Sequence, residues 1–163
     1  MGAIFNVFPL ILVPVLIYNL WAFASTAGHS TAADVRRHLD TCDATNKCLQ
    51  IPMASSEPVA GGLAGATQGV VWDVSFGTIL ILLSLIFLFI ELLKSTSTGT
   101  TAIFNHALSM LVFIICLVEF LLHPAFATST FFIIMVMALL DVLAGVVVTI
   151  VSARRDVEFA GHQ

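Results

Sequence analysis

The sequence predicts an all-α integral membrane protein whose four transmembrane helices form one bundle. Of its 163 residues, 59% are hydrophobic and 10% are charged, whereas a soluble domain is about 45–50% apolar and about 25% charged. This composition excludes a soluble enzyme domain and a disordered tail. The net charge of −4 excludes a nucleic-acid binder, which needs a basic surface. A lipid bilayer is therefore the expected surrounding of the chain.

Four apolar stretches are long enough to cross a hydrocarbon core of about 30 Å. Short turns join the last three stretches, so we expect them to be antiparallel neighbours. A long loop, residues 24–70, tethers the first stretch to the others, and residues 1–163 form a single membrane domain. The expected spans are Phe5–Phe23, Val74–Leu93, Ala102–Leu122 and Phe131–Val151.

The first span resembles a secretory signal, because Ala22, Phe23 and Ala24 fit a small-x-small cleavage pattern. However, the residues before it carry no Lys or Arg, and its apolar stretch exceeds the roughly 7–15 residues of a signal peptide. We therefore expect an uncleaved anchoring helix. Pro9 and Pro14 are expected to bend this helix, because each removes one backbone donor.

The positions of the cations set the expected orientation. Lys94, Arg154 and Arg155 directly follow the second and fourth spans, whereas the three cations of the long loop lie farther from any span end. Cations close to span ends favour the cytoplasmic side. We therefore expect a bacterial inner (plasma) membrane protein with both termini in the cytoplasm and the loop 24–70 outside.

The long loop is expected to carry a short amphipathic helix. Ser30 or Thr31 can cap a helix that runs to about Cys42, which places Val35, Leu39 and Cys42 on one face. Such a helix either lies on the membrane surface or on the bundle, or it docks a partner. Both interpretations remain open at the level of sequence.

The cysteines of the loop favour a disulfide. Cys42 and Cys48 lie close together in a segment expected in an oxidising compartment, where such thiols pair. The alternatives are free thiols or a metal site with His29 and His38, but the spacing is wider than the paired ligands of structural zinc sites. We therefore predict no metal site. Cys116, inside the third span, is expected to be an inert buried thiol.

Glycines recur every four residues ahead of the second span, at Gly61, Gly65 and Gly69, with Gly77 further along the same row. One interpretation is a flexible linker. The other is a small-xxx-small face for close helix packing, which requires the second helix to begin well before Val74.

The polar residues of the last three spans are confined to one edge of each helix at 100° per residue. The remaining faces are almost purely apolar, so we expect the three edges to turn inward. The edges comprise Asp73, Gly77, Ser84 and Glu91 in the second span, Asn105, Ser109, Cys116, Glu119 and His123 in the third, and Ala138, Asp141, Gly145 and Ser152 in the fourth.

Each edge carries a carboxylate, and only Asp141 lies at a span centre. No Lys or Arg lies within a span to neutralise it, so Asp141 requires a proton, a hydrogen-bond donor, water or another subunit. Glu91 can pair with Lys94 as an interfacial ion pair, and Glu119 can meet His123 on one helical face.

Catalytic motifs and cofactor ligands are absent from the sequence. His106 lies off the main edge of the third span, and no second His lies at a matching depth for a haem, so no cofactor is expected. We expect no enzyme but an accessory or scaffold subunit of a membrane complex or homo-oligomer, with other membrane subunits or itself as partner. The alternative is a small proton- or cation-coupled transporter or channel. Residues for the ion path or the subunit contact are Asp141, Glu119, Glu91, His123, Ser109, Asn105 and Ser84.

Overall fold

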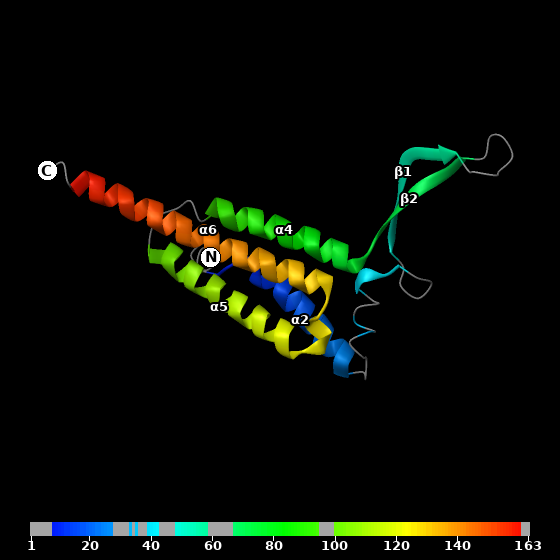
Figure 1. Ribbon diagram of the computed structural model, residues 1–163, viewed down its shortest axis with the longest axis horizontal. Coiled ribbons are helices and arrows are strands. Elements are labelled where there is room, and N and C mark those ends of the chain that lie inside the picture. Colours follow the sequence, from blue (N-terminus) through cyan, green and yellow to red (C-terminus); the bar gives the residue numbers. More distant parts are fainter. Residues whose placement is uncertain are drawn as a thin grey trace.

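The computed structural model describes residues 8–27, 33, 35, 39–42, 48–58, 67–94 and 100–160. Within them the chain forms a helical bundle with a small antiparallel sheet at one end (Figure 1). The elements in order are α2 (Leu12–Ala27), β1 (Leu49–Pro58), β2 (Thr67–Val74), α4 (Phe76–Lys94), α5 (Thr100–Leu122), the 3-10 turn η1 (Pro124–Phe126) and α6 (Ser129–Ala160).

The four helices lie side by side, with α2 and α5 running in one direction and α4 and α6 in the other (Figure 1). Both α4 and α5 pack against α6. We call the end where α4 and α6 begin, at Phe76 and Ser129, the hairpin end. The opposite end, where α4 ends at Lys94 and α5 begins at Thr100, is the turn end. At the turn end, α6 continues beyond the other helices.

Three helices are long and apolar enough to cross a membrane: Phe76–Lys94, Phe104–Leu122 and Ser129–Val151. They confirm the last three predicted spans to within a few residues. The first helix is shorter, with an apolar part over Leu12–Ala24, and the predicted start at Phe5 lies outside the described residues. The described residues therefore contain three full-length span candidates, and the first predicted span stays a prediction.

Both prolines of the first segment lie at the start of α2. Leu12 donates to the carbonyl oxygen of Pro9 at 3.2 Å, so Pro9 precedes the helix, and Pro14 falls in its first turn. Backbone N–H groups of a first turn have no partner within the helix. The prolines therefore mark where α2 begins and do not interrupt it.

Hydroxyl side chains cap α4 and α6 at the hairpin end. Ser75 Oγ accepts from the backbone N–H of Thr78 at 3.2 Å, and Thr128 Oγ1 accepts from that of Phe131 at 3.1 Å. An N-cap of this kind satisfies one of the unpaired donors of a helix start and contributes about 1 kcal/mol. Both helices thus begin at defined residues.

A β-hairpin precedes α4, which the sequence analysis did not predict. β1 and β2 pair antiparallel, from Leu49 opposite Val74 to Pro58 opposite Thr67. Because β2 runs to Val74, the second helix does not begin before that residue. The proposed helical glycine row is therefore wrong at Gly69, which lies in β2, while Gly61 and Gly65 lie outside the described residues.

The same strand corrects one member of the predicted polar edges. Asp73 lies in β2, exposed, and its carboxylate accepts from Gln50 Nε2 on β1 at 3.1 Å. The neighbouring Val71, Trp72 and Val74 are β-branched or aromatic residues, which favour strands. Asp73 therefore belongs to the hairpin and not to the edge of α4.

Part of the predicted loop helix is described, and it lies on the bundle. Ala33, Val35, Leu39 and Asp40 are helical, and Val35 and Leu39 are fully buried in the core. Thr130 Oγ1, at the start of α6, donates to Asp40 Oδ1 at 2.9 Å. The caps at Ser30 or Thr31, together with Arg36 and Arg37, lie outside the described residues.

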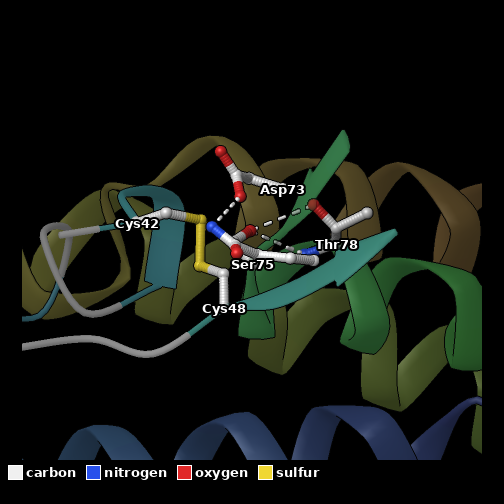
Figure 2. The surroundings of a disulfide bond; sticks show 6 residues. Cys42, Cys48, Asp73, Ser75 and Thr78 are labelled. Atoms are coloured by element: carbon white, nitrogen blue, oxygen red, sulfur yellow. Dashed lines mark hydrogen bonds between the residues drawn. A yellow bond between two sulfur atoms is a disulfide. The ribbon is translucent and has the colours of Figure 1, made fainter. Parts of the chain in front are cut away.

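Cys42 and Cys48 form the predicted disulfide, with Cα atoms 5.5 Å apart. The bond lies beside the base of the hairpin, near Asp73 and the α4 cap at Ser75 (Figure 2). Cys116 is a free, buried cysteine as expected. The disulfide therefore joins the segment that lies on the bundle to the start of β1.

The polar edges of α4, α5 and α6 turn inward as predicted. Their buried members are surrounded by an apolar core to which all four helices and the loop segment contribute. Glu119 and His123 are half-buried. The buried members are Gly77, Ser84, Glu91, Asn105, Ser109, Cys116, Ala138, Asp141 and Gly145.

Candidate functional site

A buried carboxylate joins three helices at the turn end. The Glu91 side chain is 0% exposed, and its Oε2 accepts from the backbone N–H of Leu10 at 2.7 Å. Its Oε1 accepts from Lys94 Nζ at 3.2 Å and from Asn105 Nδ2. Glu91 on α4 therefore binds the segment before α2 and the first turns of α5.

Lys94 completes this arrangement. Its Nζ also donates to the carbonyl oxygen of Phe8 at 2.9 Å and to Asn105 Oδ1 at 3.4 Å. Because the chain around Phe8 and Leu10 is not helical, its backbone groups have no partners within a helix and need such side-chain partners. The predicted Glu91–Lys94 ion pair is present, but it lies inside the bundle and holds the start of α2.

Next to this cluster, Asp141 and His106 have buried polar atoms without a hydrogen-bond partner among the described residues. Asp141 is fully buried on α6, and neither of its carboxyl oxygens has a hydrogen-bond partner within the described part of the chain. The carboxyl lies beside the Ser109 hydroxyl and within electrostatic range of Glu91, Lys94 and His106. The Ser109 hydroxyl itself donates to the Asn105 carbonyl oxygen at 3.1 Å.

His106 faces α6 from the first turns of α5. Both ring nitrogens are buried and have no hydrogen-bond partner among the described residues. A methyl group at Gly145 would overlap the imidazole, so the ring rests directly against the α6 backbone one turn beyond Asp141. From sequence, His106 was expected off the main polar edge of the third span and was not a site residue; the signal for this contact was Gly145, on the same edge as Asp141.

A separate polar contact lies toward the hairpin end. Glu119 Oε2 accepts from Asn19 Nδ2 on α2 at 3.1 Å. His123 Nδ1 accepts from the Ala125 backbone N–H at 3.4 Å, and its ring packs edge-on against Phe126. The predicted contact between Glu119 and His123 is thus replaced by a contact from α5 to α2 and a cap of η1.

The hairpin end is closed by an aromatic cluster around Tyr18. The Tyr18 hydroxyl donates to the Ala125 carbonyl oxygen at 3.1 Å and lies 2.6 Å from Thr128 Oγ1. Its ring packs against Phe126 and Phe131, with centroids 5.5 Å and 4.7 Å away. These contacts tie α2 to the η1 turn and the start of α6.

Buried apolar residues separate the two polar regions. Val112 and Cys116 on α5, with Ile134 and Ala138 on α6, lie between Asp141 and Glu119 along the helices. Ser84, also predicted as a site residue, donates to the Leu80 carbonyl oxygen of its own helix at 2.7 Å. Apart from Ser84, the predicted residues therefore form two groups, and no continuous polar path joins them within the described residues.

Within the described residues, no group of three His, Cys, Asp or Glu side chains is placed to hold a metal ion. His29 and His38, the candidate partners of the cysteines, lie outside those residues. Searches of protein-family models, curated proteins and solved structures find no match to this chain. The function is therefore argued from geometry alone.

Proposed function

We propose that the protein is an accessory or scaffold subunit of a membrane complex or a homo-oligomer. The observation that carries this proposal is the use of intramembrane carboxylates as bonds between helices. Glu91 joins α4 to α5 and to the start of α2, and Glu119 joins α5 to α2. Polar contacts of this kind contribute about 0.6–2 kcal/mol each to membrane helix association.

The proposed topology places the turn end in the cytoplasm and the hairpin outside, in a bacterial inner membrane. Lys94 and Arg154 lie toward the turn end. The positive-inside rule favours the cytoplasmic side for Lys and Arg near the ends of membrane spans. The disulfide between Cys42 and Cys48 lies at the hairpin end, and disulfides persist in oxidising compartments. Both arguments assign the same side to each end.

Purification in a mild detergent followed by native mass measurement tests the scaffold role. We expect a defined oligomer or a stoichiometric complex with other membrane subunits, released from native membranes. The matched control is the same measurement after transfer to a denaturing detergent, which separates the subunits. A stable monomer without any partner contradicts the proposal.

A small proton- or cation-coupled transporter is the second candidate. The buried and unpartnered carboxyl of Asp141 favours it, because ionisable groups inside membranes often mark ion pathways. The buried apolar residues between Asp141 and Glu119 oppose it.

Flux in liposomes distinguishes the two candidates. Transport predicts a flux that Asp141→Asn and Glu119→Gln abolish without changing expression, because each amide keeps the size of the side chain but does not titrate. A reconstituted wild-type protein that conducts no cation over a range of pH rejects the transporter.

A further inference from the structure

We propose that Asp141, beside His106, forms a proton-binding site inside the bundle that exchanges with the aqueous phase at the turn end only. This inference goes beyond the scaffold role, which needs no titrating group. It rests on three features of the described residues: the charge of the cluster, the space for the imidazole, and the distribution of polar groups along the helices.

The charges around Asp141 balance when the site binds one proton. The titratable side chains near Asp141 are Glu91 and Lys94 from α4 and His106 from α5, while the segment before α2 contributes the Leu10 N–H to the cluster. Glu91 and Lys94 neutralise each other as an ion pair. With His106 neutral, ionised Asp141 leaves one uncompensated negative charge in a region of low polarity, which is costly.

One proton removes that cost. It adds to a carboxyl oxygen of Asp141, and the cluster becomes neutral overall. Neither carboxyl oxygen of Asp141 has a hydrogen-bond partner among the described residues, so the protonated carboxyl avoids the cost of an unpaired buried charge. Water supplies the proton, and no other co-reactant is needed. A multivalent metal ion is disfavoured, because three suitable ligands do not converge in the described part of the chain.

The His106 imidazole occupies the space that Gly145 leaves open beside α6. Gly145 lies four residues after Asp141, so both lie on the same face of α6. Because Gly145 has no side chain, the ring of His106 lies against the α6 backbone at that position. Any larger residue at Gly145 would displace the imidazole.

The hydrogen-bonded polar cluster lies on the turn side of this site, whereas the buried Ser84 hydroxyl on the other side donates to its own helix. Toward the turn end lie Asn105, Glu91 and then Lys94, whose side chain is 16% exposed. Toward the hairpin end lie buried apolar residues such as Val112 and Ile134. The polar groups on the turn side therefore favour proton exchange with water at that end, while the buried apolar residues oppose passage to the other end.

Infrared pH-difference spectra of the full-length protein in lipid nanodiscs test the proposal. The wild type should show a carboxylic acid C=O band that disappears as the pH is raised, and Asp141→Asn should remove it. Asp73→Asn, a change to an exposed carboxylate of β2, is the matched control and should leave the band in place. A wild-type spectrum without an Asp141 band that titrates overturns the proposal.

Two further measurements test the packing of His106 against Gly145 and the exchange of protons with one side of the bundle only. Gly145→Ala should change or abolish the titration of that band, whereas Val146→Ala, a change to the neighbouring exposed residue of α6, should not. If Gly145→Ala leaves the titration of the Asp141 band unchanged, the packing of His106 against Gly145 has no role in the site. In vesicles with an imposed pH gradient, the wild type should carry no proton flux; a flux that Asp141→Asn abolishes overturns the one-sided site.

Discussion

A carboxylate inside a membrane bundle needs donors, and Glu91 obtains them from three different segments. The ammonium of Lys94 supplies charge, the amide of Asn105 supplies a second donor, and the backbone N–H of Leu10 supplies a third. The donation from Leu10 also places the carboxylate at the beginning of α2, where the helix dipole favours negative charge. Glu91 thereby becomes the main polar contact of the turn end.

Asn105→Ala should destabilise the bundle through Glu91. The substitution removes the donor from α5 and leaves a buried carboxylate oxygen with fewer partners, which costs about 1–3 kcal/mol. Thermal unfolding in detergent or lipid nanodiscs measures the effect. Phe104→Ala, at a neighbouring residue that is 62% exposed, is the control and should change the midpoint much less. Equal losses in both variants contradict the role of Asn105.

At the same scale, sequence reasoning succeeded where spacing on a single helix was enough. The edges containing Ser109 and Asp141 were visible because polar residues repeat with helical period. The Leu10 N–H was not visible, since a backbone donor has no sequence signature. His106 was missed because its ring packs against Gly145 of α6. The spacing of polar residues along α5 alone does not reveal a contact with another helix.

At the scale of elements, the segment Leu39–Cys42 is held to the bundle by two different bonds. The hydrogen bond from Thr130 to Asp40 attaches it to α6, and the disulfide from Cys42 to Cys48 attaches it to the start of β1. The fit at α4 is also close, since a methyl group at Gly77 would lie 2.8 Å from the Leu39 carbonyl oxygen. The segment thus connects the hairpin to the helices.

Replacing Cys42 and Cys48 by Ser should leave the membrane spans intact and raise protease sensitivity between Thr41 and Gln50. Closing so short a loop removes limited chain entropy, roughly 2–3 kcal/mol at most. Limited proteolysis of the oxidised wild type and the double variant measures the difference. Recovery of both thiols free from the oxidised compartment, or identical cleavage rates, contradicts the prediction.

Thr130→Val should loosen the same segment from the other side. Valine keeps the shape of threonine but cannot donate to Asp40, so about 1 kcal/mol of docking is lost. Hydrogen exchange of the backbone around Leu39 should accelerate. Ser129→Ala, at an exposed residue beside Thr130, is the control and should have no such effect; matching exchange rates for the two variants exclude a role for the bond.

The elements also show where prediction from sequence failed. The last three spans were found because their long apolar runs dominate any local preference. The hairpin was missed because β1 contains Pro52, Ser55 and Pro58, a composition that resembles a loop. Its pairing with β2 depends on a register between distant residues, which period-based reasoning on each segment does not reveal.

At the scale of the whole molecule, the two ends of the bundle differ. The turn end holds the polar cluster of Glu91 and Lys94, whereas the hairpin end holds the aromatic cluster of Tyr18 together with the disulfide. The apolar core between them is continuous through all four helices. A bundle built in this way presents different chemistry on the two sides of a membrane, and its orientation therefore decides which partners it meets.

Cysteine labelling with a membrane-impermeant reagent tests that orientation. We expect a cysteine at Ser55, in β1, to react in intact cells or spheroplasts, because the hairpin is proposed to lie outside. A cysteine at Gln163 should react only after the membrane is opened, because the cationic side chains of Lys94 and Arg154 favour the cytoplasmic side for the turn end. Opened membranes, in which both positions should react, are the control. The reverse pattern would overturn the topology, and it would place Cys42 and Cys48 in a reducing compartment, where a disulfide does not persist.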